Sequence, residues 1–258
     1  MRETLQIPES LVRLLRAAHT VVAFTGAGIS AESGVPTFRD AQTGLWARYD
    51  PRDLATPQAF MRNPKLVWDW YEWRRSLVEQ AQPNPGHRAL AVMEGLVPEM
   101  AVVTQNVDGL HQRAGSQRVI ELHGRLGRYR CFDCGRPVRR EEAAPPGPEG
   151  VPRCPHCGGL IRPDVVWFNE PLPQDALEQA SAWMRKADVV LIVGTSAQVW
   201  PAAGLPLEAK RAGAVLVEVN PQPSQLAPVV DFALRGPAGQ WLPALVTATW
   251  PEAASAFA

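Results

Sequence analysis

Short apolar segments recur along this chain, and they constrain its fold more than any other feature of the sequence. They cover residues 21–25, 100–108, 187–196, 214–221 and 229–234. Strands buried on both faces of a parallel sheet are continuously apolar and rich in β-branched residues. Most of these segments adjoin a stretch with helical spacing, and residues 5–19 and 239–256 also read as helices. This alternation predicts an α/β fold in which helices cover both faces of a doubly wound parallel sheet.

Two regions, residues 40–82 and 124–165, break this alternation. The first is rich in Trp and spaced like helices, with no strand-like segment. The second holds all four cysteines and the loop EEAAPPGPEG, whose Pro and Gly residues disfavour regular structure. We expect both regions to form a smaller domain, with Trp68, Trp70 and Trp73 in its core. We expect the main domain to comprise residues 1–39, 83–123 and 166–258.

The cysteines form two C-x2-C pairs with 19 residues between the pairs. Each pair can present two thiolates from one tight turn, and two such turns can surround a zinc ion tetrahedrally. Gly135 and Gly158 follow the pairs, where the turns need a flexible backbone. His156 could replace one thiolate, but it lies between two better-placed cysteines, and we expect it to be exposed. A closed set of four ligands predicts one structural zinc ion bound by Cys131, Cys134, Cys154 and Cys157.

Small and polar residues follow three of the predicted strands, at the edge where open α/β sheets bind ligands. They are Gly26 to Ser30, Gly194 to Ser196, and Asn220. Glycine lets the backbone approach a pyrophosphate, and the next helix N-terminus offers free N–H groups. A tight turn with no ligand is the alternative for a lone GxG. Ala31 takes the last position of GxGxxG, and no acidic residue about 20 positions on ends a second strand, so ordinary hydride transfer is disfavoured.

The charge balance and the absence of long apolar segments weigh against other classes of protein. Basic and acidic side chains number 26 each, so no net field favours nucleic acid or anionic lipid. No segment has the roughly 18 unbroken apolar residues of a membrane span. The first ten residues lack the apolar core of a signal peptide. We therefore expect a cytoplasmic protein whose partners include neither a membrane nor nucleic acid.

Several longer motifs make the sequence specific. GAGISAESGVPTFR at 26–39, TQNVDGLH at 104–111, LHG at 122–124, GTSAQVWP at 194–201 and VEVNP at 217–221 occur, with the paired cysteines, in the order seen in sirtuins. Over residues 20–240 the chain therefore resembles sirtuins, which are NAD-dependent protein lysine deacylases. The resemblance implies a large Rossmann-like domain, a small zinc-binding and helical domain, and an active site in the cleft between them. It also implies NAD as co-substrate and acyl-lysine proteins or peptides as partners, and we expect a monomer.

The resemblance further implies roles for individual residues. The cofactor-binding residues are Gly26, Ala27, Gly28, Ser30, Phe38, Arg39, Gln105, Asn106, Asp108, Gly194, Thr195, Ser196, Asn220 and Ala238. Of these, residues 26–28 contact the pyrophosphate, residues 38 and 39 lie over the nicotinamide end, Gln105 contacts the ribose, and Asn106 and Asp108 hold the nicotinamide region. Residues 194–196 and Asn220 bind the adenosine half, and Ala238 lies near the adenine. The catalytic residues are His123 and Asn106. Without its motif, His123 would read as a packed core histidine.

The implied reaction accounts for this set of residues. The carbonyl oxygen of the acyl-lysine attacks C1′ of the nicotinamide ribose, and nicotinamide leaves. A pocket that binds the nicotinamide amide lowers the barrier to this oxocarbenium-like step. His123, neutral near pH 7, then acts as general base to a ribose hydroxyl, which attacks the imidate carbon. Water releases the lysine, and the products are free lysine, nicotinamide and O-acyl-ADP-ribose.

Tyr71 and Arg74 are the candidates for recognition of the acyl group. Their spacing of three places them on one helix face, where a phenol and a guanidinium could bind a carboxylate. A solvated Arg beside a packed Tyr is the alternative on spacing alone. The Tyr-x-x-Arg pair, with GLW at 44–46 and DLATP at 53–57, resembles class III sirtuins of bacteria and mitochondria, in which the pair selects succinyl- and malonyl-lysine. We expect a desuccinylase and demalonylase with residual deacetylase activity.

One departure from the family pattern concerns the substrate peptide. Asn169 stands where sirtuins usually have Gly, in the stretch that pairs with the peptide as an added strand. Asn adopts unusual backbone angles almost as Gly does, so we expect peptide binding to survive while peptide preference is in doubt. Three alternative functions remain: an acetyl-preferring deacetylase, a mono-ADP-ribosyltransferase that uses the same NAD site, and a non-catalytic NAD- or nucleic-acid-binding module.

Overall fold

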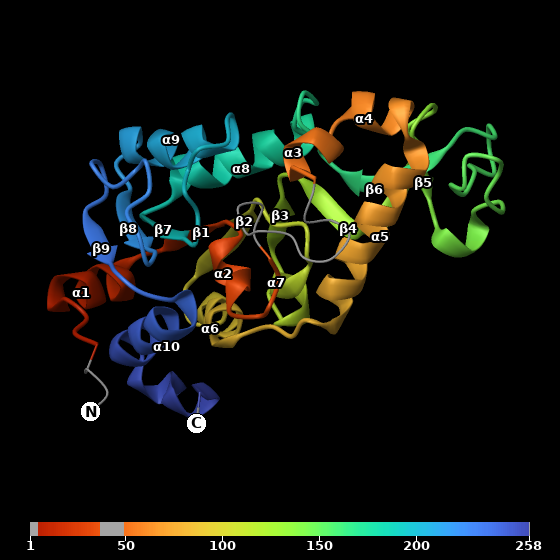
Figure 1. Cartoon of the computed structure of the whole chain (residues 1–258). Coiled ribbons are helices and arrows are strands. Elements are labelled where there is room, and N and C mark those ends of the chain that lie inside the picture. Colours follow the sequence, from red (N-terminus) through yellow and green to blue (C-terminus); the bar gives the residue numbers. More distant parts are fainter. Residues whose placement is uncertain (1–4, 37–48, 258) are drawn as a thin grey trace.

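A parallel sheet between two layers of helices forms the larger part of the molecule (Figure 1). The structure is a computed structural model, and it describes residues 5–36 and 49–257. The sheet has the strand order β3–β2–β1–β7–β8–β9. Its strands are β1 (Thr20–Thr25), β2 (Glu99–Thr104), β3 (Val119–Glu121), β7 (Val189–Val193), β8 (Val215–Val219) and β9 (Phe232–Leu234). All neighbouring strands are parallel, so their carboxyl ends lie at one edge, and the predicted doubly wound fold is confirmed.

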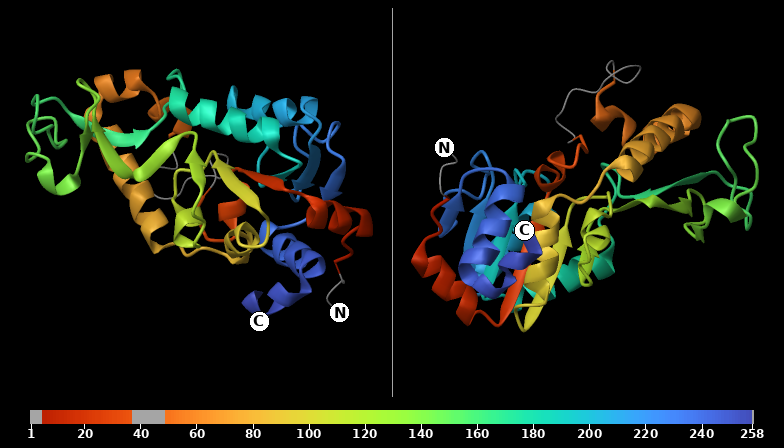
Figure 2. Two further views of the ribbon diagram at one scale, coloured as in Figure 1. Left: turned by 180° about the vertical axis from the view of Figure 1, so that it is seen from behind. Right: turned by 90° about the horizontal axis from the view of Figure 1, so that it is seen from below.

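Helices cover both faces of this sheet (Figure 2). One layer consists of α1 (Glu9–Ala17), α6 (Pro85–Glu94) and α10 (Ala238–Thr249), and the other of α8 (Gln174–Lys186) and α9 (Leu205–Arg211). Side chains of β1 alternate between the layers: Val21 and Ala23 pack with the first, whereas Val22 and Phe24 pack with the second. This double burial is the physical reason that the strand is continuously apolar.

Proline residues set the limits of the first and last helices. α1 begins at Glu9, after Pro8, and not at residue 5 as predicted. α10 ends at Thr249, and a separate 3-10 helix (Pro251–Phe257) follows, so the predicted closing helix is two elements. Proline lacks a backbone N–H and disfavours helical angles in the residue before it, which explains both differences.

The smaller part of the molecule combines helices with an antiparallel sheet. The helices are α3 (Pro51–Leu54), α4 (Pro57–Arg62) and α5 (Pro64–Gln80), and the strands are β4 (Gly124–Cys131), β5 (Pro137–Val138) and β6 (Ile161–Val165), in the order β5–β4–β6. α5 starts after Asn63, whose side chain accepts the N–H of Leu66. Trp68 and Trp70 are buried in the core between helix and sheet, and Trp73 packs against that core, as predicted.

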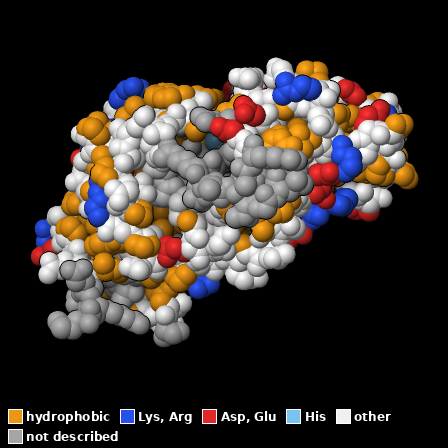
Figure 3. All heavy atoms as spheres, viewed as in Figure 1, with side chains coloured by type: hydrophobic (Ala, Val, Ile, Leu, Met, Phe, Trp, Pro, Cys, Tyr) orange, Lys and Arg blue, Asp and Glu red, His pale blue; other side chains and the backbone are white. Residues whose placement is uncertain are grey.

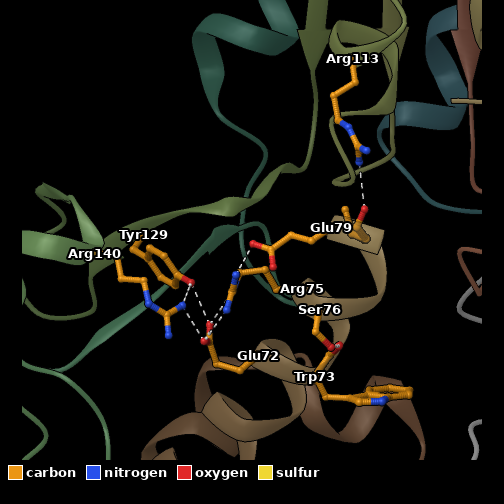
Figure 4. A network of polar contacts seen from close by, with 9 residues as sticks. Glu72, Trp73, Arg75, Ser76, Glu79, Arg113, Tyr129 and Arg140 are labelled. Atoms are coloured by element: carbon orange, nitrogen blue, oxygen red, sulfur yellow. Dashed lines mark hydrogen bonds and ion pairs between the residues drawn. The ribbon is translucent and has the colours of Figure 1, made fainter. Parts of the chain in front are cut away.

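Glu72 of α5 ties this helix to the small sheet (Figure 4). Its carboxylate accepts hydrogen bonds from the Tyr129 hydroxyl of β4 at 2.8 Å and from Arg75 Nη2 at 3.1 Å, and Arg140 Nη1 lies 2.7 Å away. Burial alone would raise the pKa of the Glu72 carboxyl, but these three partners lower it below its usual value. The network therefore fixes the position of α5, which carries both candidates for acyl recognition.

Among the described residues, four short helices lie in the connecting segments: α2 (Gly28–Ala31), α7 (Leu110–Arg113), and the 3-10 helices Arg140–Glu142 and Ala202–Gly204. On the face of the molecule shown in Figure 3, described basic and acidic side chains are interspersed, in keeping with the balanced charge of the sequence. No helix within residues 5–36 and 49–257 is both long and apolar enough to cross a membrane.

Candidate active site

A cavity of about 1070 Å³ lies at the carboxyl ends of β1, β2, β7 and β8. Residues of α5 and of the segment after β6 complete its wall. Among the described residues, it brings together nearly all those predicted from the sequence, namely Gly26, Ala27, Gly28, Ser30, Tyr71, Arg74, Gln105, Asn106, Asp108, His123, Gly194, Thr195, Ser196 and Asn220. Phe38, Arg39 and the GLW segment at 44–46 lie outside the described residues. Ala238 does not line the cavity, because it is buried at the start of α10, where that helix meets Gly86 of α6.

Two glycine turns lie against each other at the floor of the cavity. The N–H of Gly28 donates to the carbonyl of Gly194 at 2.7 Å, and the N–H of Gly26 donates to the carbonyl of Val193 at 3.0 Å. Gly194 has a φ of +60°, and a Cβ atom there would lie 2.3 Å from the backbone nitrogen of Ile29. The turns after β1 and β7 therefore meet backbone to backbone, an approach that only glycine permits.

Ser30, Asn106 and Asp108 form a buried polar cluster beside these turns. The Ser30 hydroxyl donates to Asp108 Oδ2 at 2.7 Å and accepts from Asn106 Nδ2 at 3.2 Å. Asn106 Nδ2 also donates to the carbonyl of Gly26 at 3.1 Å. Burial raises the pKa of the Asp108 carboxyl, although the N–H of Leu110 and the Ser30 hydroxyl oppose this effect. The cluster holds three predicted site residues in fixed orientations.

His123 reaches the cavity with one ring nitrogen already engaged. Its Nδ1 lies 2.9 Å from the carbonyl oxygen of Gln105. A carbonyl only accepts, so Nδ1 carries the proton and the other nitrogen, Nε2, keeps its lone pair. Burial lowers the pKa of His123, although the hydrogen bond to Gln105 opposes this effect. A neutral imidazole with a free Nε2 can take a proton from a neighbouring hydroxyl.

The ends of three strands are linked across the cavity by Thr195. Gln105, after β2, donates from Nε2 to the Thr195 hydroxyl at 3.0 Å, and Asn220, after β8, donates from Nδ2 to the Thr195 carbonyl at 2.9 Å. These contacts fix the polar side chains at the sheet edge before any ligand binds.

Tyr71 and Arg74 lie on the face of α5 that lines the cavity. Tyr71 is buried, and Arg74 is partly buried with its guanidinium carbon 5.0 Å from the centre of the Trp70 ring. Burial raises the pKa of the Tyr71 phenol well above its usual value, with Arg74 opposing, and burial lowers the pKa of Arg74. The pair thus lines a shared cavity.

The four cysteines gather at the far end of the small sheet. Their Sγ atoms all lie within 4.8 Å of one another, with Cys131 3.5 Å from Cys157 and Cys134 3.9 Å from Cys154. Thiolates 2.3 Å from a tetrahedral zinc ion are spaced comparably, so the four could bind one zinc ion. His156 is exposed and lies outside the cluster, as predicted. No cysteine lines the cavity, in keeping with a structural metal.

A pair of buried histidines beneath the site was not predicted. His87 and His111 lie with their ring centres 4.9 Å apart. His111 Nε2 is 2.9 Å from the Thr25 hydroxyl, and His87 Nε2 is 3.4 Å from the Ser30 hydroxyl. Burial lowers the pKa of His87 to about 4 and that of His111 well below its usual value, so both rings are neutral at pH 7. The only local signal was the Asn84-Pro-Gly-His87 sequence, which forms a capping box at the start of α6.

The sheet, its glycine turns and the polar strand ends are those of a Rossmann-like nucleotide-binding protein. The family model described as "Sir2 family" matches residues 26–201. The NAD-dependent protein deacylase 2 of Pyrobaculum aerophilum is 54% identical over 233 residues, which cover 90% of this chain and 92% of that protein. The NAD-dependent protein deacylase of Aquifex aeolicus is 54% identical over 215 residues, covering 83% of this chain and 89% of that protein. The chain therefore belongs to the Sir2 family, as its motifs predict.

Solved structures agree with this assignment. A Sir2 homologue in complex with NAD superposes with a TM-score of 0.88 at 45% identity, covering 98% of this chain and 97% of that one. A Sir2 complex with a p53 peptide and NAD+ superposes with a TM-score of 0.81 at 34% identity, covering 93% of this chain and 98% of that one.

Proposed function

We propose that this chain is an NAD-dependent protein lysine deacylase that removes succinyl and malonyl groups, and acetyl groups more slowly. The observation that carries the proposal is a single cavity lined by His123, by the glycine turns after β1 and β7, and by the Tyr71–Arg74 pair. The relatives described above are NAD-dependent protein deacylases, and the related structures were solved with NAD and with a peptide. Residues 1–39, 83–123 and 166–258 form the NAD-binding domain, and the zinc-binding and helical domain comprises residues 40–82 and 124–165.

The strand ends provide the groups that a dinucleotide needs. Residues 26–28 line the cavity and contact the pyrophosphate, because glycine at 26 and 28 lets the backbone approach it closely. Gln105 contacts the ribose, and Asn106 and Asp108 hold the nicotinamide end, with Ser30 keeping both in place. Residues 194–196 and Asn220 bind the adenosine half. The roles of Phe38, Arg39 and Ala238 in NAD binding rest on the family resemblance alone.

The remaining residues of the cavity serve the transfer of the acyl group. Bound NAD supplies the electrophilic C1′ of its nicotinamide ribose, which the acyl carbonyl oxygen attacks as nicotinamide leaves. Asn106 is fixed by Ser30 and Gly26 and positions the nicotinamide end for this step. His123 takes the proton of a ribose hydroxyl at Nε2, because Nδ1 is held by Gln105 and burial keeps the ring neutral. The hydroxyl oxygen bonds to the acyl carbon, and water then releases lysine and O-acyl-ADP-ribose.

The acyl chain is selected by Tyr71 and Arg74. A guanidinium and a phenol on one wall can form charge-assisted hydrogen bonds to the distal carboxylate of a succinyl or malonyl group. An acetyl group has no such carboxylate, so it gains nothing from these donors. The dicarboxylic acyl groups are therefore the better substrates.

The substrate peptide and the metal occupy separate parts of the molecule. The partner is an acyl-lysine protein or peptide, which adds as an extended strand beside Phe168 and Asn169 at the rim of the cavity. Cys131, Cys134, Cys154 and Cys157 bind one structural zinc ion.

The proposal is tested by Arg74→Met on peptides that carry succinyl, malonyl or acetyl lysine. Loss of a hydrogen bond to a charged group should lower kcat/KM roughly 10- to 150-fold for the two dicarboxylic acyl groups and leave deacetylation nearly unchanged. Arg62→Met is the control, because Arg62 is an exposed arginine of α4 in the same part of the molecule and does not line the cavity. Equal losses on all three peptides would refute the carboxylate role.

A further inference from the structure

The indole N–H of Trp167 is a buried donor without an acceptor. Trp167 follows β6, is 1% exposed and lines the cavity. Within the described residues, three buried side-chain polar atoms lack a hydrogen-bond partner: Trp167 Nε1, His111 Nδ1 and Ser116 Oγ. Of these residues, only Trp167 belongs to the cavity wall. A buried N–H without an acceptor is costly, so one that lines a binding cavity calls for an acceptor on the ligand.

The indole is held rigidly, so it cannot rotate to find an acceptor within the protein. Arg162 stacks on it, with the guanidinium carbon 3.2 Å from the ring centre, and Phe60 packs at 5.4 Å between ring centres. Arg162 is itself fixed by two hydrogen bonds to Glu170, at 2.5 and 2.9 Å. The Trp167 backbone N–H donates to the same carboxylate at 2.8 Å. Both the ring and its backbone are therefore anchored.

The indole N–H lies next to the proposed acyl site. The Tyr71 and Trp167 rings are stacked, with 6.2 Å between their centres and 29° between their planes. The N–H is close enough to the phenol to lower its pKa, against the larger upward effect of burial, yet it does not meet hydrogen-bonding geometry. Trp167, which lines the same cavity as Tyr71 and Arg74, therefore brings an N–H beside the Tyr71 phenol.

The wall consequently presents donors of three kinds. A guanidinium and an indole can only donate, and the buried phenol of Tyr71 keeps its proton at neutral pH and donates as well. A group with several lone pairs and no proton of its own matches such a wall. A carboxylate, with two oxygens and about four lone-pair sites, is that group.

We propose that Trp167 Nε1–H donates a hydrogen bond to the distal carboxylate of the acyl group, as a third specificity-determining contact beside Tyr71 and Arg74. The inference rests on the proposed deacylase function and deepens it. An acetyl group does not reach this N–H with an acceptor, so Trp167 contributes to the discrimination between dicarboxylic acyl groups and acetyl.

The first test is Trp167→Phe, which removes the N–H and keeps an aromatic ring. The ratio of kcat/KM for succinyl-lysine to that for acetyl-lysine should fall roughly tenfold or more, mostly through KM. Because Phe is smaller, a second variant carries 3-benzothienylalanine at position 167, which replaces N–H by sulfur at nearly constant shape. This variant should lower the ratio as well, and it tests the hydrogen bond even if Trp167→Phe does not fold. Trp68→Phe is the control, since Trp68 belongs to the same core without lining the cavity.

A direct readout comes from 15N-indole NMR of the wild-type protein. The Trp167 resonance is identified by its absence in either variant, and it should move downfield with a succinyl-lysine peptide but not with an acetyl-lysine peptide. The inference would be overturned by an unchanged ratio of kcat/KM for succinyl-lysine to acetyl-lysine in the benzothienyl variant. It would also be overturned by a Trp167 indole resonance that does not shift with the succinyl-lysine peptide. If Arg74→Met lowers the ratio while the Trp167 variants do not, the inference fails and the proposed function stands. If Arg74→Met also leaves the ratio unchanged, both fail.

Discussion

Gly194→Ala is expected to disable the NAD site by separating two backbone turns. Gly194 follows β7 with a φ of +60°, and a Cβ there would lie 2.3 Å from the Ile29 nitrogen and 2.6 Å from the Gly28 carbonyl carbon. Both are backbone atoms, so neither can relieve the clash by a change of rotamer as a flexible side chain could. Left-handed backbone costs about 1–2 kcal/mol for a residue with a Cβ, and overpacking adds about 1–3 kcal/mol. We therefore expect the free energy of unfolding to fall by about 2–5 kcal/mol.

The functional consequence should be larger than a loss of stability alone. Relief of the clash requires the turn after β1 to move, which breaks the 2.7 Å hydrogen bond from Gly28 to Gly194 and displaces the proposed pyrophosphate site. Urea unfolding and calorimetric NAD titration, both at a temperature where the variant is folded, measure the two effects. Gly213→Ala is the control: its φ is +103°, no atom lies within 4 Å of its Cβ position, and it is remote from the cavity.

Gly213→Ala should lose only the free energy of backbone strain, and it should bind NAD like the wild type. Should Gly194→Ala bind NAD normally and unfold no more readily than Gly213→Ala, the close approach of the two turns would have no part in the site.

Four further predictions follow from charge, backbone and metal. Because burial lowers the pKa of His123 and protonation destroys the general base, kcat/KM should rise with pH through a midpoint below 6.5; a midpoint above 6.5 would contradict this. Glu72→Gln should lower the free energy of unfolding by about 1.5–3 kcal/mol at pH 7 in a urea titration. The pKa of Glu72 is depressed, so the wild type loses this advantage as the pH falls and the carboxyl protonates, and the gap between the two proteins should close in acid. Asn169 has a φ of +71°, which Gly adopts readily, so Asn169→Gly should not lower Tm. It should change the ranking, by kcat/KM, of peptides that differ in the residues beside the acyl-lysine. An unchanged ranking would show that the Asn side chain does not contact the peptide. A strong zinc chelator should lower Tm, and added zinc should restore it. A Tm that neither the chelator nor zinc changes would argue against a bound metal.

The sheet could be predicted because burial on both faces leaves a local trace in the sequence. Each of the apolar segments overlaps one strand of the observed sheet, with the strand bounds differing by one residue at the start of β1 and β2. β3 was missed because it has three residues, of which only Ile120 is buried, and so short a strand has no periodicity to detect. The antiparallel order β5–β4–β6 was not predicted either, since it depends on pairing between segments far apart in the sequence.

The site was predicted where its residues lie in continuous motifs and missed where packing brings distant residues together. Gly26, Asn106 and Gly194 each follow a strand, so strand positions alone place them at one edge of the sheet. His87 and His111 belong to different helices, and their proximity arises from tertiary packing. The indole of Trp167 is likewise significant only because its N–H is buried without an acceptor, which no sequence pattern reveals.

The positive φ of Asn169 was anticipated in part. Asn can replace Gly in unusual backbone conformations, and the φ of Asn169, +71°, is in the left-handed region. Whether its side chain alters peptide preference stays a prediction, because that depends on the bound peptide.

The central claim is that this cavity couples removal of the acyl group to cleavage of NAD, and mass spectrometry of one succinyl-lysine peptide tests it most directly. With NAD present, each lysine freed should be matched by one nicotinamide and one O-succinyl-ADP-ribose, and without NAD no lysine should be freed. Release of lysine at an undiminished rate without NAD, or ADP-ribose left attached to the peptide, would contradict the account.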